Sequence, residues 1–530
     1  MGKTGADVVV KKITLMLLVV IPLLVLHFTA PLEAAPVKLG SEVLMSSRHD
    51  LIAGKRVGLV TNQSGVNSRG ESTIEVLSRD KTIQLAALYG PEHGIDGQAP
   101  AGEYVESYVH PALGIPVYSL YGQTRMPTEE MLEGIDVLLF DVQDIGARSY
   151  TYMSTLNYCM VAAQKYGKAI IVLDRPNPVG GVIAEGPVLE EAYRTFVGVD
   201  NLPMAHGMTA GELAQFFNRK IGAQLTVVPM DGYNRSMVFQ DTGLQWVPTS
   251  PHITDLDAVF GYMATGLGEG TGISQADNFK WIGGKGVDSQ SFAGLLNGSG
   301  LPGVTFIPED RGASSGVRLQ ITDYHTFNPA LTGIYALTYA HGLNGFEVPK
   351  SGETVVMFDK IMGTDKIGRF LEQGLSPQQI KAAYEPDLQR FMEERKQYLL
   401  YGDGDGLLPG NDREGIRIVV NGRVVPFDSA PYIDEHDRTM VPLRAIAEAL
   451  GAEVGWNGQA RVVTIQRDDQ VSLFTIDSNT AVFSGVRVSM DTCPVIRNDR
   501  TMLPVRYVAE SLGAAVDWDQ DTMTVNIESV

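Results

Sequence analysis

Residues 83–94 read Ile-Gln-Leu-Ala-Ala-Leu-Tyr-Gly-Pro-Glu-His-Gly, and they carry the strongest signal for fold and function in the chain. The apolar run Ile83 to Leu88 is typical of a buried strand in a parallel sheet. A Gly-Pro pair ends that strand, and Glu92 follows with His93 beside it. In open α/β sheets, ligands bind in the crevice at the carboxyl ends of the strands. We therefore predict that Glu92 and His93 lie where a reacting group is held.

A second apolar run, residues 137–140, leads directly into the polar segment Asp-Val-Gln-Asp-Ile-Gly-Ala-Arg-Ser-Tyr-Thr-Tyr at residues 141–152. Further apolar runs at 57–60, 170–173 and 225–228 also alternate with amphipathic stretches. This alternation predicts βαβ units and a parallel sheet with helices on both faces. Because each run ends in polar residues, we expect those ends to form a binding site at one edge of the sheet.

The length and composition indicate a folded protein of several domains. A chain of 530 residues exceeds the size at which a single core stops growing. Its formal net charge of -20 argues against nonspecific binding to nucleic acid. Its two cysteines, Cys159 and Cys493, fall in different predicted domains, so we expect no stapling disulfide.

The N-terminus has the layout of a secretory signal peptide. Lysines precede an apolar segment from Ile13 to Leu26, and a small-residue stretch near Ala34 and Ala35 follows it. The alternative is an uncleaved anchor, but the apolar segment contains Pro22 and is shorter than the roughly 20 residues of a membrane span. We therefore predict a signal peptide at residues 1–35 and a secreted protein, extracellular or associated with the cell wall.

The remaining chain divides into four predicted parts. Residues 38–230 form a Rossmann-like α/β domain, and residues 231–401 form a smaller α+β domain that completes a cleft. The Asp/Gly-rich residues 402–414 form a linker. In residues 415–530, Asp-Arg-Thr-Met-Val-Pro-Leu-Arg at 437–444 returns as Asp-Arg-Thr-Met-Leu-Pro-Val-Arg at 499–506. This repeat indicates a duplicated α+β unit.

Taken together, these stretches resemble the exo-β-N-acetylmuramidase (NamZ-like) family, formerly known as a domain of unknown function. The resemblance spans about residues 38 to 401. The matching stretches are residues 58–63, 90–94, 119–122, 141–152, 174–178, 185–187, 206–209, 211–213 and 358–364. Residues 415–530 resemble the stalk-type domain named after the N-terminal region of copper amine oxidases, although no copper site is implied.

The resemblance implies an exo-acting glycosidase that releases N-acetylmuramic acid from the non-reducing end of its substrate. The implied partners are peptidoglycan fragments or muramyl disaccharides, with cell-wall contact through residues 415–530. No cofactor and no metal are expected. One stretch departs from the family pattern. After Glu269-Gly270-Thr271 this chain reads Gly-Ile-Ser-Gln-Ala-Asp-Asn, where the family usually has Asn and then Ser-Glu-Gly-Arg-Gly. The departure bears on substrate fine specificity and on catalytic competence.

Glycoside hydrolysis normally needs two carboxyl groups that flank the scissile bond. We predict Glu92 as the general acid, because a Gly-Pro turn holds it at the crevice. The alternative is that Glu92 caps a helix or pairs with His93. Glu185 is favoured as the second carboxylate over Asp144 and Glu269, because its small-residue setting is similar to that of Glu92. The alternative for Glu185 is a structural carboxylate that satisfies loop amides.

Other polar residues of these loops are expected to contact the substrate. Arg148, or less favourably Arg175, can clamp a lactyl carboxylate, unless these arginines pair with neighbouring aspartates. The tyrosines can offer a sugar-stacking face or pack in the core. The amides can bind sugar groups or stabilise turns. The predicted substrate-binding residues are Asn62, Gln63, His93, Asp144, Arg148, Tyr150, Tyr152, Asn177 and Glu269.

Two rival functions remain open at this stage. The first is a metal-assisted esterase or amidase that uses His93 and His206, although lone histidines more often form hydrogen bonds. The second is a non-catalytic glycan-binding protein. The Gly-x-Ser-x-Gly pattern at residues 312–316 is rejected as a nucleophile elbow, because no apolar strand leads into it.

Overall fold

The computed structural model describes residues 37–402 and most of 417–529, with gaps at 422, 426–430, 435, 437, 459, 468–469, 498–499 and 520–523. The predicted signal peptide and most of the predicted linker lie outside the described residues. Within the described part of the chain, no helix is both long enough and apolar enough to cross a membrane.

Seven strands form the first sheet: β1 (Arg56–Thr61), β2 (Gln84–Gly90), β3 (Tyr108–Val109), β4 (Pro116–Ser119), β5 (Val137–Asp141), β6 (Ala169–Leu173) and β7 (Leu225–Val228). Their order is β3-β4-β2-β1-β5-β6-β7, and all neighbours are parallel except the edge strand β3. The parallel sheet predicted from the apolar runs is confirmed. Strand β4 was not predicted, because it is four residues long and begins with a proline.

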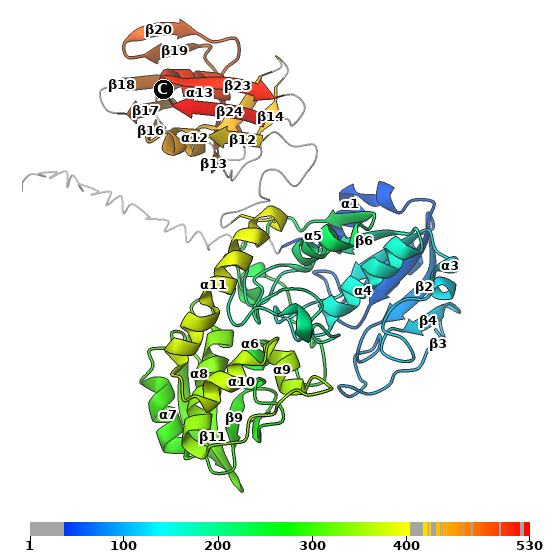
Figure 1. Ribbon diagram of the computed structural model, residues 1–530. Coiled ribbons are helices and arrows are strands. Elements are labelled where there is room, and N and C mark those ends of the chain that lie inside the picture. Colours follow the sequence, from blue (N-terminus) through cyan, green and yellow to red (C-terminus); the bar gives the residue numbers. More distant parts are fainter. Residues whose placement is uncertain are drawn as a thin grey trace, which may run out of the picture. The chain divides into compact units, whose positions relative to one another are not determined.

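Side chains of each central strand alternate between two cores, as a sheet covered on both faces requires. On β5, Val137 and Leu139 face one core, whereas Leu138 and Phe140 face the other. The elements around this sheet are α1 (Gly40–Ser47), η1 (His49–Leu51), α2 (Thr73–Arg79), α3 (Glu129–Glu133), α4 (Tyr152–Lys165), η2 (Glu191–Tyr193), α5 (Ala210–Ile221) and η3 (Phe239–Thr242). Leu44 of α1 and Leu77 of α2 cover the first face, and α4 and α5 cover the second (Figure 1).

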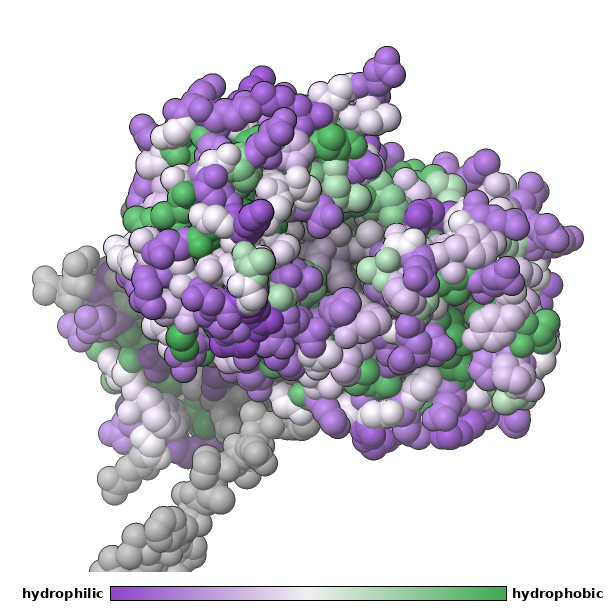
Figure 2. All heavy atoms as spheres, turned by 90° about the horizontal axis from the view of Figure 1, so that it is seen from below, coloured by the Kyte–Doolittle hydropathy of each residue, from purple (hydrophilic) through white to green (hydrophobic). Residues whose placement is uncertain are grey.

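A second lobe contains a four-stranded antiparallel sheet in the order β10-β11-β9-β8. Its elements are α6 (Leu256–Thr265), β8 (Ile273–Ala276), β9 (Trp281–Gly284), α7 (Ser289–Asn297), β10 (Val304–Arg311), β11 (Ser314–Ile321), α8 (Pro329–Asn344), α9 (Met357–Met362), α10 (Lys366–Glu372), α11 (Pro377–Arg395) and η4 (Lys396–Tyr398). One hydrophobic core runs through this lobe into the first. In the view of Figure 2 the surface is hollowed near its centre. Residues 312–313 form the turn between β10 and β11, which agrees with the rejection of a nucleophile elbow.

The C-terminal part has a hydrophobic core of its own. Its elements are β12 (Arg417–Val420), β13 (Arg423–Val424), β14 (Tyr432–Ile433), β15 (Thr439–Pro442), α12 (Leu443–Ala449), β16 (Glu453–Asn457), β17 (Val462–Arg467), β18 (Gln470–Thr475), β19 (Thr480–Phe483), β20 (Val486–Ser489), β21 (Val495–Arg497), β22 (Arg500–Pro504), α13 (Val505–Ser511), β23 (Ala514–Asp519) and β24 (Thr524–Ser529). The two copies of the repeat pair with each other, because β15 lies antiparallel to β22 with Val441 opposite Leu503. The predicted fold class, α/β with a smaller α+β part and a duplicated C-terminal unit, is confirmed.

Candidate active site

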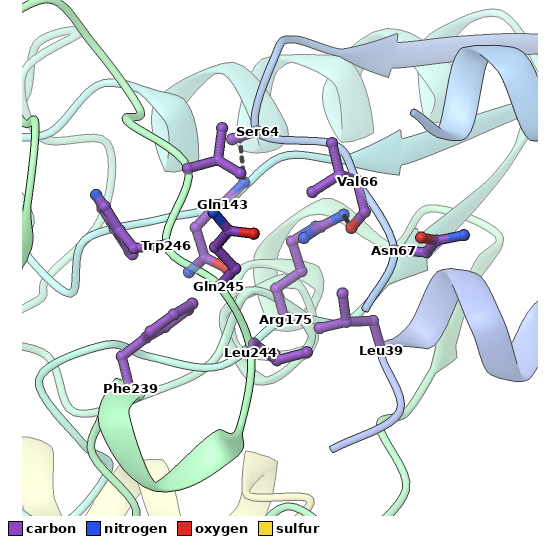
Figure 3. Close-up of a pocket in the computed structure, with 11 residues that line it drawn as sticks. Leu39, Ser64, Val66, Asn67, Gln143, Arg175, Phe239, Leu244, Gln245 and Trp246 are labelled. Carbon is purple, nitrogen blue, oxygen red and sulfur yellow. Dashed lines mark hydrogen bonds between the residues drawn. The ribbon is translucent and has the colours of Figure 1, made fainter. Parts of the chain in front are cut away.

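The crevice between the carboxyl ends of β1 and β5, where the strand order reverses, is almost filled. It encloses a cavity of about 20 Å³, enough for about one water molecule. Gln245 and Trp246 lie against Gln143 there, and the Arg175 guanidinium donates to the Val66 carbonyl at 2.7 Å (Figure 3). A switch-point crevice is the usual ligand site of such sheets. In this protein the cavity lined by Gln143, Arg175 and Trp246 is too small for a sugar.

The charged residues at the ends of β5 and β6 belong to this filled region. Arg175 Nε donates to Asp141 Oδ1 at 2.5 Å, and both side chains are buried. Thr73 donates its hydroxyl to the second Asp141 oxygen. Arg175 is therefore neutralised within the fold, so it has the ion-pair role that was the alternative to a substrate clamp.

Glu92 lies outside this region, in the turn after β2. Its carboxylate is partly exposed and is held from two sides. The Gly102 amide donates to Oε1 at 2.9 Å, and the Thr151 hydroxyl donates to Oε2. Gly90 and Pro91 thus end the strand as predicted, and the following loop returns to fix the carboxylate. A carboxylate with one oxygen fixed by backbone and the other facing a hydroxyl is well placed to exchange a proton.

His93 is buried in the same turn, with a left-handed backbone (φ 72°). Its Nδ1 lies 2.6 Å from the Ala99 carbonyl, to which it donates. The ring meets Tyr152 edge-on, with the centroids 6.5 Å apart. His93 therefore shapes the loop between Glu92 and Gly102, and it does not form an ion pair with Glu92.

The charges of three carboxylates act on the hydroxyl of Tyr262, on α6. The pKa of Tyr262 is raised to about 12, mainly by burial; a hydrogen bond with Ser149 lowers it, and the negative charges of Glu92, Asp144 and Glu269 also raise it. Ser149 Oγ lies 3.3 Å from the Tyr262 hydroxyl. Glu269 is exposed in the turn after α6. Two loops of the first lobe and one turn of the second therefore carry carboxylates whose charges act on one phenol.

Asp144 is buried and has one oxygen without a partner. Its Oδ2 accepts from the Gly146 amide at 2.9 Å and from His206 Nε2 at 3.1 Å. His206 Nδ1 accepts from the Met208 amide at 3.2 Å, so Nε2 carries the proton that is donated to Asp144. The other oxygen, Oδ1, is buried and forms no hydrogen bond within the described residues.

The two predicted sugar-stacking tyrosines are packed in the core. Tyr150 is 7% exposed and Tyr152 is 1% exposed, and their rings meet edge-on at 4.8 Å. Both hydroxyls donate to Thr249, to its Oγ1 and its carbonyl respectively. The core-packing alternative therefore describes both rings, whose place is to support the side of the site below Glu92.

Asn62 and Gln63, which follow β1, adjoin this aromatic pair. Gln63 Nε2 donates to the carbonyls of Pro248 and Thr249 at 2.9 and 3.0 Å. Asn62 Oδ1 accepts from the Ser64 amide and hydroxyl. The Asn62 Nδ2 and Gln63 Oε1 atoms are buried and have no hydrogen-bond partner among the described residues.

Glu185 lies in a different setting from Glu92. Its Oε1 accepts from the Gly186 amide at 2.8 Å and the Tyr384 hydroxyl at 3.0 Å. Its Oε2 lies 3.2 Å from Asn328 Nδ2 and 3.4 Å from Lys381 Nζ. These contacts tie the loop after β6 to α8 and α11. They match the alternative weighed for Glu185, a structural carboxylate.

Arg148 and Asn177 are likewise engaged inside the fold. Arg148 is buried and donates to the carbonyls of Pro187, Leu202 and Ile361 at 2.6–2.7 Å, and burial lowers its pKa to about 9. Asn177 donates to the Met208 carbonyl at 3.1 Å and accepts from the Val179 amide. Both Nη atoms of Arg148 are therefore used in a link between the lobes, and only its Nε, which is buried, has no hydrogen-bond partner among the described residues.

Three residues at the site were not singled out from the sequence. Thr151 lay in a segment already recognised as polar, but nothing marked its hydroxyl as the partner of Glu92. Tyr262 stands in an apolar helical pattern that gives no signal. Arg125 follows β4, a strand that the sequence analysis missed, so the polar residues after it were not placed at a strand end.

Two histidines were considered as metal ligands, and no contact joins them. His93 bonds to Ala99, and His206 bonds to Asp144. Among the described residues, no group of three or more potential ligands gathers around a common point. Cys159 and Cys493 are both free, as expected.

Comparison with known proteins places this geometry in a family. The family described as exo-beta-N-acetylmuramidase NamZ matches with its N-terminal part at residues 57–257 and its C-terminal part at residues 260–401. The copper amine oxidase N-terminal domain matches residues 419–527. Peptidoglycan beta-N-acetylmuramidase NamZ of Bacillus subtilis is 43% identical over 386 residues, which are 69% of this chain and 91% of that protein.

Two solved structures share the fold. Both are DUF1343 family proteins from Bacteroides fragilis. The first is 36% identical with a TM-score of 0.63, and the second is 26% identical with a TM-score of 0.53. Each comparison covers 69% of this chain and 99% of the solved chain.

Proposed function

Because this chain belongs to the exo-β-N-acetylmuramidase NamZ family of glycosidases, we propose that it hydrolyses the β-glycosidic bond of a non-reducing terminal N-acetylmuramic acid in peptidoglycan fragments. Such an activity serves cell-wall turnover and recycling. The observation that carries the proposal is the setting of Glu92. Its Oε1 is held by the Gly102 amide, and its Oε2 faces the Thr151 hydroxyl.

In the proposed reaction, Glu92 is the general acid. The proton resides on Oε2, because Oε1 already accepts a backbone hydrogen bond. A hydroxyl can donate or accept, so Thr151 can hold Oε2 in both protonation states of the carboxyl. Glu92 then delivers the proton to the leaving glycosidic oxygen as the bond to the sugar breaks.

For the second carboxylate we propose Asp144 in place of Glu185. Asp144 shares the surroundings of Tyr262 with Glu92 and has a free oxygen, Oδ1. The His206 Nε2–H bond fixes the other oxygen and so directs Oδ1. An ionised carboxylate in this place can activate water or stabilise the developing positive charge on the sugar.

The test compares wild type with Glu92→Gln on two substrates, a 4-nitrophenyl β-muramide and a muramyl disaccharide. General acid catalysis contributes about 10²–10⁴ to the rate. On the disaccharide, whose leaving group needs a proton, the rate of Glu92→Gln should be lower than that of wild type by this factor. On the 4-nitrophenyl glycoside, whose leaving group needs no proton, the decrease in rate should be much smaller. Equal losses on both substrates would reject Glu92 as the acid.

We also propose that the protein is exported and reaches the cell wall through residues 415–530. The Lys-rich and apolar N-terminus supports export, and mass spectrometry of the N-terminus of the secreted chain tests it. Trp456 and Trp518 occupy matching positions in the two repeats and are 47% and 38% exposed. Co-sedimentation of the full chain with purified wall, compared with the Trp456→Ala/Trp518→Ala variant, tests the wall contact.

A further inference from the structure

Arg125 stands apart from the buried arginines of the first lobe. Arg175 and Arg235 each form an ion pair, and Arg148 donates to three carbonyls. Arg125 has no ion pair with any described residue, and its Nη1 is buried without a hydrogen-bond partner. A buried guanidinium nitrogen without a partner is costly, so its retention needs an explanation.

The guanidinium is held between aromatic rings. Its Cζ lies 3.6 Å from the centroid of Tyr121 and 4.8 Å from that of Phe196. The Tyr121 and Phe196 rings are 6.0 Å apart, and Phe196 packs on Tyr158 at 5.3 Å. Stacking on aromatic faces orients a guanidinium and leaves its N–H edge available for a carboxylate.

The backbone that carries Arg125 is also fixed. The Thr124 hydroxyl accepts from the Met126 amide at 3.0 Å and donates to the Met126 carbonyl at 2.7 Å. These two bonds bracket Arg125 in a tight turn. A side chain that is stacked and anchored in this way loses little further freedom when it binds an anion.

One loop connects Arg125 with Glu92. Gly102 donates to Glu92, and three residues later the Val105 amide donates to the Tyr121 carbonyl at 3.1 Å. The charge of Glu92 raises the pKa of the Tyr121 phenol and that of Arg125 lowers it, so both groups face Tyr121, although burial is the largest cause of its raised pKa. The stacked guanidinium and the residue proposed to protonate the scissile bond therefore both lie close to the Tyr121 side chain.

We propose that Arg125 binds the lactyl carboxylate of the muramic acid and so sets the preference for this sugar over one without a lactyl group. The inference rests on the proposed function and adds the residue that recognises the substrate anion. A planar guanidinium matches a carboxylate with two parallel hydrogen bonds. It replaces Arg148 and Arg175 in this role, because both Nη atoms of Arg148 donate to backbone carbonyls and Arg175 is paired with Asp141.

The test measures kcat/KM on two 4-nitrophenyl β-muramides, one with the free lactyl carboxylate and one with its methylamide. Arg125→Met keeps much of the packing but removes the charge. This substitution should lower kcat/KM on the free acid by roughly 10–100-fold, mainly by raising KM. It should change kcat/KM on the methylamide by less than about threefold. Arg79→Met, at an exposed arginine of α2, is the control and should leave both values unchanged.

Equal losses of Arg125→Met on the two substrates, or no loss on the free acid, would overturn the proposal. If the methionine variant does not fold, Arg125→Lys decides. If Arg125→Lys lowers the ratio of kcat/KM on the free acid to kcat/KM on the methylamide several-fold, the proposal is supported. If this ratio is unchanged, the proposal is rejected. A wild type that turns over neither muramide would reject the proposed function instead. Calorimetric titration with free N-acetylmuramic acid and with N-acetylglucosamine then still tests Arg125. The affinity of the protein for N-acetylmuramic acid should depend on this arginine, whereas its affinity for N-acetylglucosamine should not.

Discussion

Thr151 occupies the N-cap position of α4, yet its hydroxyl donates to Glu92 Oε2 and makes no capping hydrogen bond. A threonine at an N-cap ordinarily satisfies an amide of the first helical turn. Here the hydroxyl is committed to a carboxylate that lies 59 residues earlier in the chain. The start of α4 therefore holds the carboxylate of Glu92, the proposed general acid, and leaves its own first turn without a side-chain cap.

Replacing Thr151 by valine should reduce catalysis more than stability. The valine keeps the shape but cannot hold Oε2, and a hydrogen bond to a charged group is worth roughly 1.5–3 kcal/mol. We expect kcat on the muramyl disaccharide to fall by at least about 10-fold, whereas thermal stability should fall only modestly, because Glu92 is partly exposed and water can replace the lost bond. Thr151→Ser, which retains the hydroxyl, should stay near wild type. A valine variant with wild-type kcat would show that the bond has no role in the reaction.

Asp144 and Glu185 can be separated by a matched pair of amide substitutions. Asp144→Asn removes the carboxylate near Tyr262, so we expect kcat to drop by about 10² or more on aryl and disaccharide substrates alike. Glu185→Gln weakens the contacts to Tyr384 and Lys381, so it should lower the melting temperature and leave the kcat of the folded enzyme within a few-fold. Steady-state kinetics and thermal unfolding of both variants check this. The reverse pattern would restore Glu185 as the second carboxylate.

Asp174 makes the stability of the fold depend on pH. Its carboxyl is buried and accepts from Gly211, Thr209 and Tyr401, and burial nevertheless raises its pKa to about 7. A folded-state pKa above the ordinary value near 3.8 means that folding favours the protonated form. The corresponding stability is present below about pH 4 and is lost as the pH rises through 7.

Asp174→Asn mimics the neutral acid, because the hydroxyls of Thr209 and Tyr401 can turn to accept from its NH₂ group. The free energy of unfolding of the variant relative to wild type should therefore rise by a few kcal/mol between pH 4 and pH 8. Urea unfolding at several pH values measures this difference. A difference that does not change with pH would mean that Asp174 is already ionised throughout.

The buried pair Glu212 and Arg235 should behave as a unit. Arg235 Nη1 donates to both carboxylate oxygens at 2.7 and 2.8 Å, and Glu212 also accepts from the amides of Thr209 and Leu400. Removal of one partner leaves a buried charge, so Glu212→Gln or Arg235→Met should each cost about 3–5 kcal/mol. Urea unfolding should show that the double variant loses clearly less free energy of unfolding than the two single variants lose together. Additive losses would indicate that the charges do not interact.

The sequence by itself determined the layered fold and the place of Glu92 at the end of a strand. Apolar runs such as 137–140 bury both faces of a parallel sheet, and this pattern is local in the chain, so the strands could be predicted directly. Glu92 could be found because a Gly-Pro pair at a strand end needs no distant contact to stop the strand. The family resemblance rested on the same short stretches.

Only the tertiary structure decided which polar residues are free to react. The roles of Asp144, Glu185 and Arg148 depend on contacts with residues 39 to 213 positions away in the chain. The role proposed for Arg125 depends on a buried atom that has no hydrogen-bond partner among the described residues. Glu185 and Arg148 have their polar groups used by helices of the second lobe and by loop carbonyls. Asp144 Oδ1 and Arg125 Nη1 are buried without a hydrogen-bond partner among the described residues. A hydrogen bond depends on distances across the folded chain, and those distances have no local signature in the sequence.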